Sequence, residues 1–528
     1  MSSSSLARGM VGVLLLATFA GAQATHKDTK LGFSFKPPKD YKAIAVSPGD
    51  VLTVAKYQAE QMEYGGKQGA AGFSRLFEVE FWSLPRIQED DEEQGANATG
   101  SEGAGPRSVE EWWADLLDNR YGYPELEKDR VITVDGVDAR EVEFPIKDSA
   151  LKHYVAMVPQ PDGVFLLSGV SVDSRFEKAS QDSSKAARSF KRSERVDDRA
   201  HKSELSQMDE QERFLQQQID KLPPGWSHLR TKRYLFLYDT DKAFAQELAD
   251  RIEAMRDVYE TYYPPDKPIE AVSIVRVCAT LDEYHGYGGP QGTGGYWNSA
   301  ERELVIFDFR PRELTLAVLN HEAFHQFIFY FYGELSPHSW YNEGTGDYYA
   351  GAKLTKSNRV TSFGDAPGGI GRLGTIKEAA RLLGEGKSGA DGACPPLKKL
   401  MKFHQRDYYG SSGYDGGICY AAGWGVVHFL REGKSLDPKW QKILPDYLKS
   451  LLEARHEVAV ETMKKDRENA EKVKAGSSAD MSDDPTDWYV KVDEDKVQDR
   501  AHEKTFKDWT DADWAAFQAA WLKYVEKL

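Results

Sequence analysis

The pentapeptide His321-Glu322-Ala323-Phe324-His325 combines residue types that can carry out hydrolysis at a metal ion. If the segment is helical, His321 and His325 lie one turn apart on the same face and can bind one ion together. Glu322 would then lie beside the metal, where its carboxylate could accept a proton from an attacking water. The alternative interpretation, a pair of buried helix histidines without a metal, is weakened by the residues that follow.

Glu343 is the candidate for the third protein ligand that a catalytic zinc site requires. It lies in a second helical pattern that begins after the metal helix. Asp347 follows one turn later on the same face, so we expect it to hydrogen-bond a ligating histidine. The sequence therefore predicts one Zn²⁺ ion bound by His321, His325 and Glu343, with His338 as a weaker substitute ligand.

The elements that must position these residues have recognisable boundaries. The metal helix is expected to begin near Pro311 and to end near Gly333, and its spacing of apolar residues predicts a buried face. Apolar and β-branched runs predict the strands Tyr234–Tyr238, Ala271–Cys278 and Leu304–Phe307 upstream of it. This half of the chain is therefore expected to be α+β, with a small mixed sheet, the metal helix and a mostly helical C-terminal part.

Together with Trp340-Tyr341-Asn342-Glu343-Gly344, the pentapeptide resembles the motif of the gluzincin metallopeptidases. The pattern is similar to the aminopeptidase/leukotriene-hydrolase branch and to the bacterial peptidase MA-like proteins. The resemblance covers roughly residues 226–528 and implies a zinc peptidase. The segment Cys419–Gly425 resembles the family's Tyr-x-x-Gly-aromatic helix. It implies that Tyr420 donates a hydrogen bond to the oxyanion, with Tyr408, Tyr409 and Tyr414 as alternatives.

Residues Gly294–Asn298 stand where the aminopeptidases carry a Gly-x-Met-Glu-Asn edge strand. The resemblance implies that Gly295, Tyr296 and Trp297 bind substrate. In the aminopeptidases the glutamate of this strand binds the free amine of the substrate, and Trp297 takes its place here. This departure favours an endopeptidase, acting on peptide or protein substrates, over an aminopeptidase.

The whole chain has 528 residues and a formal net charge of −16, which argues against nucleic acid as a partner. The first 24 residues are typical of a secretory signal peptide. Their apolar stretch is too short to span a bilayer, and Ala22-Gln23-Ala24 offers a cleavage site. We expect a mature chain that is not inserted in a membrane and is secreted, periplasmic or in the cell envelope. The oligomeric state is not predicted.

Composition shifts divide the rest of the chain into four expected parts. Residues 25–200 are expected to form a β-rich α+β module whose order of elements faintly resembles PsbP. Residues 201–225 are charged and Gln-rich and are interpreted as a linker. Residues 226–375 carry the zinc site, and residues 376–528 form the helical part that completes it.

Three cysteines are present, and a disulfide between Cys394 and Cys419 is possible in an exported protein. Two other functions stay open from the sequence. One is a secreted binding protein with a vestigial zinc site, and the other is a zinc hydrolase acting on a non-protein or cell-wall amide. The first is disfavoured because the base, the third ligand and the tyrosine are all present.

Overall fold

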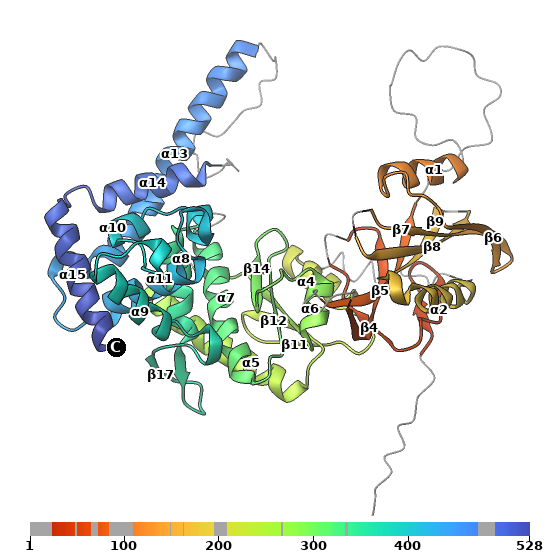
Figure 1. The fold of residues 1–528 in the computed structure, drawn as a ribbon, viewed down its shortest axis with the longest axis horizontal. Coiled ribbons are helices and arrows are strands. Elements are labelled where there is room, and N and C mark those ends of the chain that lie inside the picture. The colour runs from red at the N-terminus through yellow and green to blue at the C-terminus, as the bar shows by residue number, and fades with distance from the viewer. Residues whose placement is uncertain are drawn as a thin grey trace, which may run out of the picture. The chain divides into compact units, whose positions relative to one another are not determined.

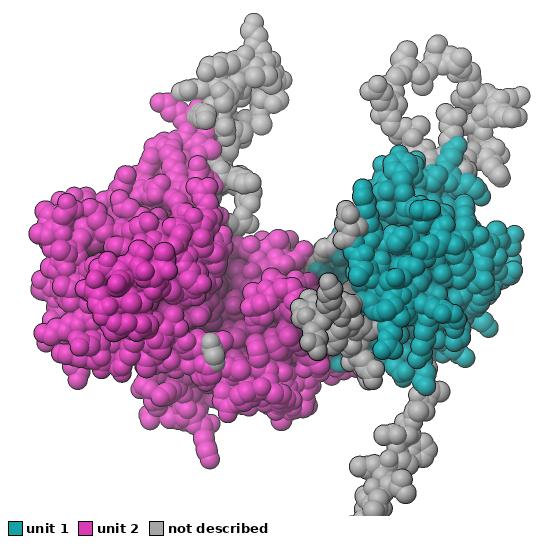
Figure 2. Space-filling view, viewed as in Figure 1, with its two compact units in different colours: residues 1–204 teal, residues 205–528 magenta. Residues whose placement is uncertain are grey.

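The computed structural model describes residues 24–47, 50–64, 72–83, 109–147, 149–161, 163–194, 208–265, 268–332, 336–473 and 492–528. Within these residues the chain has a mixed α+β fold with several separate sheets (Figure 1). The chain divides into two compact units, residues 1–204 and residues 205–528 (Figure 2). The expected signal peptide, up to residue 23, and the end expected for the metal helix at Gly333 lie outside the described residues.

The first unit is built on a seven-stranded antiparallel sheet with one helix packed on each face. Its elements are β3 Tyr41–Ile44, β4 Thr53–Tyr64, β5 Gly72–Trp82, α1 Val109–Asn119, β6 Lys128–Val134, β7 Val137–Pro145, β8 Leu151–Gln160, β9 Gly163–Val172 and α2 Phe176–Arg188. The strands lie in the order β3-β4-β5-β9-β8-β7-β6. Alternate strand residues form two apolar layers, one closed by Phe176 and Ala187 of α2 and the other by Trp112 and Trp113 of α1.

The connection between β6 and β7 is a tight hairpin at Asp135-Gly136. Both residues have positive φ, 50° and 82°, as a two-residue turn between right-twisted strands requires. A second, three-stranded sheet is formed by β1 His26–Asp28, β2 Phe33–Phe35 and β10 Lys191–Arg192. The sequence does not predict this sheet, because strands of two or three residues are too short to show an alternating pattern.

The second unit contains a five-stranded mixed sheet. Its strands are β11 Ser227–Arg230, β12 Tyr234–Tyr238, β13 Ser273–Cys278, β14 Gly295–Asn298 and β15 Glu303–Phe307. They lie in the order β11-β12-β13-β15-β14, with the three central strands parallel and the two edge strands antiparallel to their neighbours. The central strands are buried along their whole length, so they are mostly apolar, and the charged residues Arg276 of β13 and Glu303 of β15 pair with each other at 2.8 Å.

Helices form most of the rest of the second unit (Figure 1). Their bounds are α4 Glu210–Asp220, α5 Lys242–Tyr262, α6 Leu281–Tyr287, α7 Arg312–Tyr332, α8 Ser339–Ala350, α9 Leu373–Gly384, α10 Leu397–Leu400, α11 Gly416–Glu432, α12 Pro438–Gln441, α13 Ile443–Val473, α14 Glu494–Thr505 and α15 Asp511–Lys527. A short hairpin of β16 Ala352–Leu354 and β17 Val360–Phe363 follows α8. One apolar core joins the sheet and α5 to α7, α8, α11 and α15.

Two helices of this region lie at boundaries expected from composition. Helix α4 lies inside the segment interpreted as a linker, and its Leu215 packs against Leu235 of the sheet. Helix α4 is amphipathic, with a charged surface and Leu215 as its buried side chain. Helix α9 crosses the boundary expected at residue 375, and its Ile376 belongs to the common core.

All three cysteines, Cys278, Cys394 and Cys419, are buried free thiols, so the disulfide considered between Cys394 and Cys419 is not formed. Burial raises the pKa of both Cys394 and Cys419 to about 12, and the two thiols stay protonated. None of the helices in the described ranges is both long enough and apolar enough to cross a bilayer.

Candidate metal centre

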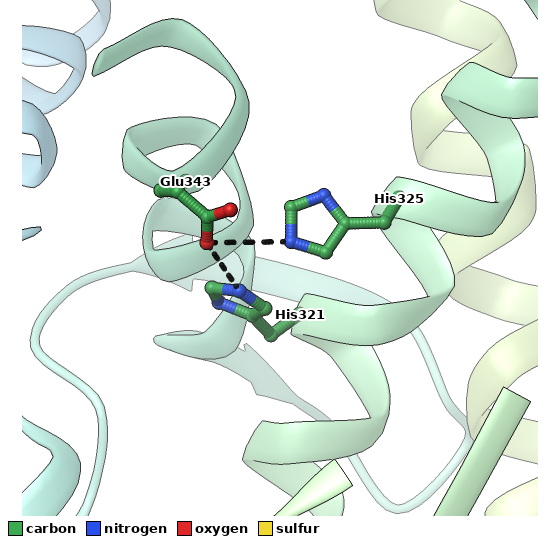
Figure 3. A group of neighbouring side chains, drawn as sticks. All are labelled: His321, His325 and Glu343. Carbon is green, nitrogen blue, oxygen red and sulfur yellow. Dashed lines mark hydrogen bonds and ion pairs between the residues drawn. The ribbon is translucent and has the colours of Figure 1, made fainter. Parts of the chain in front are cut away.

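Helix α7 places His321 and His325 on one face, because residues four positions apart lie one above the other. The helix is held in the core by Leu319, Ala323 and Phe324, which are all fully buried. This packing fixes the rotation of the helix about its axis. The two imidazoles are therefore held toward the same neighbouring helix, as Figure 3 shows.

That neighbour is α8, and its Glu343 points between the two histidine rings (Figure 3). Glu343 Oε2 lies 3.3 Å from His321 Nε2 and 3.6 Å from His325 Nε2. One ligand atom from each of the three residues lies within 4.8 Å of the others, which is the spacing that a shared metal ion requires. The structure thus brings together the three residues predicted as metal ligands.

The close approach of the two helices depends on Gly346. A Cβ at this position would lie 2.9 Å from His321 Nδ1 and from His321 Cε1, which is too close for any side chain. Glycine is a poor residue for a helix interior, yet α8 is continuous from Ser339 to Ala350. A glycine is therefore needed at position 346, because the His321 ring occupies the space that a side chain would fill.

The outer nitrogen of each histidine has a hydrogen-bonding partner on α8. His321 Nδ1 lies 3.1 Å from Asp347 Oδ1, and His325 Nδ1 lies 3.1 Å from Asn342 Oδ1. When each Nδ1–H donates to its partner and the ring is neutral, the Nε2 lone pair of each histidine faces Glu343. Asp347 was expected in this position, whereas Asn342 was not predicted as a partner.

Asp347 is in turn held by Arg372, which precedes α9. Arg372 Nε donates to Asp347 Oδ2 at 2.7 Å and Nη2 donates to Oδ1 at 3.3 Å. Asp347 is only 5% exposed, so this bond satisfies a carboxylate that would otherwise be buried with one partner. Sequence reasoning missed Arg372 because it lies in a Gly-rich segment that has no periodic pattern.

The charges within this group stabilise one another. Burial alone would lower the pKa of His321, but hydrogen bonds to Asp347 and Glu343 outweigh burial and raise that pKa well above its ordinary value. Burial alone would raise the pKa of Glu343, but the positive charge and hydrogen bonds of the histidines hold it well below its usual range. Glu343 is therefore an ionised, buried carboxylate, which is the form that binds a cation.

Glu322 lies beneath the edge strand β14. A Cβ at Gly295 would lie 3.1 Å from Glu322 Cγ and 2.7 Å from Val318 Cγ1, so a glycine is needed for the strand to approach α7. Burial raises the pKa of Glu322, and the charge of Glu343 adds to this effect, while both histidines oppose it. A carboxylate with a raised pKa beside the three ligands is suited to accept and return a proton.

The other two residues of β14 predicted to bind substrate point to opposite sides of the strand. The Trp297 ring lies 5.4 Å from the Phe329 ring of α7, and the Tyr296 ring lies 5.9 Å from the Tyr284 ring of α6. Gly295, Tyr296 and Trp297 all line the cleft over the metal ligands. None of the residues of β14 carries a carboxylate, and Trp297 occupies the face of the strand toward α7.

Tyr420 of α11 reaches the site through Tyr409. The Tyr420 hydroxyl donates to the Tyr409 hydroxyl at 3.0 Å, and the Tyr409 hydroxyl donates to Glu343 Oε1 at 3.2 Å. Burial raises the pKa of Tyr420, and the negative charge of Glu343 raises it further, so the phenol keeps its proton. The Arg372 guanidinium lies 4.9 Å from the centre of the Tyr420 ring and holds it in place.

The three tyrosines considered as alternatives to Tyr420 differ in position. Tyr409 contacts Glu343 directly and lines the cleft, on the short π-helical turn η4 Asp407–Ser411. Tyr408 is fully buried and does not line the cleft, and Tyr414 packs against Phe403 instead. The sequence ranks Tyr420 above Tyr409 because Tyr420 matches the family's Tyr-x-x-Gly-aromatic motif, which Tyr409 does not.

A cleft of about 1940 Å³ lies over the metal ligands. Its lining includes the three ligands, Glu322, the β14 residues, Asn342, Asp347, Tyr409 and Tyr420, together with Arg302, Arg372 and Arg455. Its volume exceeds the range of about 300–1,000 Å³ that is usual for small-molecule sites. The cleft is therefore large enough for an extended polymer.

Comparison with known proteins gives no family for the chain. No family model and no curated protein matches it. Among solved structures, cyanobacterial PsbP from Synechocystis sp. PCC 6803 is 13% identical with a TM-score of 0.23, over 35% of this chain and 97% of that one. A structure from Bacteroides thetaiotaomicron VPI-5482 is 8% identical with a TM-score of 0.20, over 64% of this chain and 85% of that one. The similarity to PsbP is thus faint.

Proposed function

We propose that the second unit is a zinc-dependent peptidase of the gluzincin type that cleaves peptide bonds with Glu322 as general base. The observation that carries the proposal is the convergence of His321, His325 and Glu343 at the floor of a large cleft with Glu322 beside them. A vestigial binding site would have no need of a buried base and a tyrosine in addition to the ligands.

Zinc suits this donor set on chemical grounds. Two imidazole nitrogens and one carboxylate oxygen, with a fourth position left open, make up the ligand set of catalytic zinc sites. Because Asp347 and Asn342 bind the outer nitrogens, the inner nitrogens of both histidines are available to a metal. When bound there, zinc supplies a Lewis acid that lowers the pKa of water toward neutrality and polarises a carbonyl.

The chain's own residues supply the proton transfers. Glu322 takes a proton from the attacking water on a carboxylate oxygen and delivers it to the leaving amine nitrogen. The raised pKa of Glu322 makes it a stronger base than an exposed carboxylate. Strand β14 packs close to its side chain, so the carboxyl group is partly shielded from bulk water while it lines the cleft.

Tyr420 is proposed as the hydrogen-bond donor to the oxyanion, with Tyr409 positioning it. Tyr420 lies on the rigid helix α11 and is held by Arg372, whereas Tyr409 lies in a π-helical turn and is 48% exposed. A preorganised donor stabilises a developing charge better than a mobile one. Such a donor is worth about 3 kcal/mol of barrier.

The edge strand and the size of the cleft support an endopeptidase. Strand β14 has neighbours on one side only, so an extended substrate can pair with its free edge through main-chain hydrogen bonds. Trp297 occupies the place at which an aminopeptidase would bind the free amine, and β14 offers no carboxylate for that purpose. Residues 1–24 support the further proposal that the mature enzyme acts outside the cytoplasm on peptide or protein substrates.

The test is hydrolysis of internally quenched peptides by the purified chain before and after removal of metal. Chelation should abolish cleavage, and reloading with Zn²⁺ should restore it. The variant Glu343→Ala should lose zinc affinity at this site, whereas Glu432→Ala, which removes a carboxylate bonded to Tyr348 instead, should not. Normal zinc content at the site in Glu343→Ala would show that the third ligand is wrong. A zinc-loaded wild type that cleaves no peptide would favour a cell-wall or other non-protein amide.

A further inference from the structure

A second group of possible metal ligands lies outside the cleft. It consists of His338, His404 and Asp499, whose ligand atoms lie within 4.8 Å of one another. His338 precedes α8, His404 precedes the turn η4, and Asp499 lies on α14. None of the three lines the cleft over the candidate zinc site. The group therefore belongs to a different place in the second unit.

His338 is fully buried and has one nitrogen with no partner. Its Nδ1 lies 2.9 Å from the Tyr447 hydroxyl, which also accepts from the His338 backbone N–H at 2.8 Å. Its Nε2 is buried and forms no hydrogen bond with any described residue. Leaving a buried polar atom unpaired costs roughly 1–3 kcal/mol, so this nitrogen calls for a partner that protein atoms do not supply.

His404 presents its two nitrogens in a similar way. Its Nδ1 lies 3.0 Å from Gln498 Oε1 and 3.3 Å from Asp495 Oδ1, while its Nε2 lies 3.3 Å from Asp499 Oδ1. Donation from Nδ1–H leaves a lone pair on Nε2, facing the Asp499 carboxylate. In both histidines Nδ1 is bonded to a protein group. Nε2 of His338 has no partner among the described residues, and Nε2 of His404 is paired with Asp499, a pattern that suits metal-ligating histidines.

We propose that His338, His404 and Asp499 form a second binding site for a divalent transition metal, with zinc as the best match to two imidazoles and one carboxylate. The bound ion would give His338 Nε2 its missing partner. It would also join α14 to the N-terminal end of α8, the helix that carries Glu343. Since these segments come together only in the folded chain, binding at this site stabilises the fold.

Two further features agree with a metal at this place. The ring centre of His502 lies 6.1 Å from that of His338, and its buried Nδ1 also has no partner among the described residues. His502 thus places a second buried ring with an unpartnered nitrogen beside His338. The side chain of Asp499 is 61% exposed, so an ion can enter from solvent without opening the core. The site does not depend on the peptidase proposal, because it shares no ligand with the candidate active site.

The experiment counts metal ions in the full chain after exhaustive chelation and reloading with Zn²⁺ alone. His325→Ala/Glu343→Ala removes two ligands of the first site and serves as the background. We expect two ions per chain in the wild type and one in the background. Adding Asp499→Asn to the background should lower the zinc affinity of the remaining site by at least about 100-fold. This loss is larger than the one expected when only a hydrogen-bonding partner of a ligand is removed. Adding Glu503→Gln, an exposed carboxylate one turn further along α14, should leave one ion.

A second ligand variant and a Co²⁺ absorption measurement test the site independently of the ion count. His404→Gln in the same background should also lose the ion, with circular dichroism checking that the fold is retained. In the otherwise unsubstituted chain, Asp499→Asn should remove the visible absorption of the second Co²⁺ equivalent while Glu503→Gln keeps it. If the background binds no ion, or if its ion survives both Asp499→Asn and His404→Gln, the second site is wrong. If the wild type binds one ion that Asp499→Asn removes, this site stands and the first site fails.

Discussion

Replacing Asp347 with Asn should weaken zinc binding without removing any metal ligand. Asp347 accepts a hydrogen bond from His321 Nδ1 at 3.1 Å and is itself held by Arg372 at 2.7 Å. An amide at this position keeps the size and one acceptor oxygen, so the change isolates the negative charge. Without that charge, His321 becomes a weaker donor to the metal.

The structure sets the expected magnitude. Losing an outer partner of a ligating histidine costs roughly 10–100-fold in metal affinity, which is about 1.4–2.7 kcal/mol. Arg372 already neutralises part of the Asp347 charge, so the lower half of this range, about 10–30-fold, is expected. The matched control is Asn342→Ala, which removes the neutral partner of His325 Nδ1. A hydrogen bond between neutral groups contributes less than one to a charged group, so its effect should be smaller.

The assay is competition for Zn²⁺ against a chromophoric chelator, with Asp499→Asn present in every protein so that only the first site is titrated, at the pH where the wild type is stable. We expect Kd to increase in the order wild type, Asn342→Ala, Asp347→Asn. A Kd for Asp347→Asn within twofold of the wild type would refute the role given to Asp347. A larger effect of Asn342→Ala than of Asp347→Asn would refute the argument from charge.

Three other predictions concern separate parts of the chain. Tyr420→Phe should lower kcat by roughly 100-fold at unchanged zinc content, because it removes the proposed oxyanion donor; an unchanged kcat would assign that role elsewhere. Gly346→Ala should lower zinc affinity, because its Cβ would lie 2.9 Å from the His321 ring, and a Kd equal to the wild type would contradict the packing argument. Burial and the nearby Arg120 lower the pKa of His153 from 6.5 to about 4, so the unfolded chain binds more protons between these values. The stability of the first unit should be full above pH 6.5 and about 3 kcal/mol lower by pH 4, and denaturant melts of His153→Gln should lack most of that decline.

The elements that carry chemistry could be predicted because their periodicity is strong. The pattern around His321 and His325 gives a helix from about Pro311, and α7 begins at Arg312. The part expected to be mostly helical contains α10 to α15 and ends with α15 at Lys527. Buried parallel strands such as β12 appear in the sequence as unbroken apolar runs, so their position is also readable.

Long-range partners of the site could not be predicted in the same way. Arg372 reaches Asp347 from an irregular Gly-rich segment, and Tyr409 reaches Glu343 from a π-helical turn. Neither residue has a spacing that relates it to α7 or α8, so only the tertiary fold brings them to the site. The charge of the segment 201–225 is equally compatible with a linker and with α4, and burial of Leu215 decides between them.

The most direct test of the central claim is mass spectrometry of new chain termini after incubation with a denatured protein mixture, comparing the wild type with Glu322→Gln. Both proteins should be loaded with zinc to the same content, so that the comparison isolates the proposed base. The account predicts internal cuts with the wild type and none with Glu322→Gln at equal zinc content. Equal cutting by the two proteins would contradict the role of Glu322, and trimming confined to amino ends would contradict the argument from Trp297.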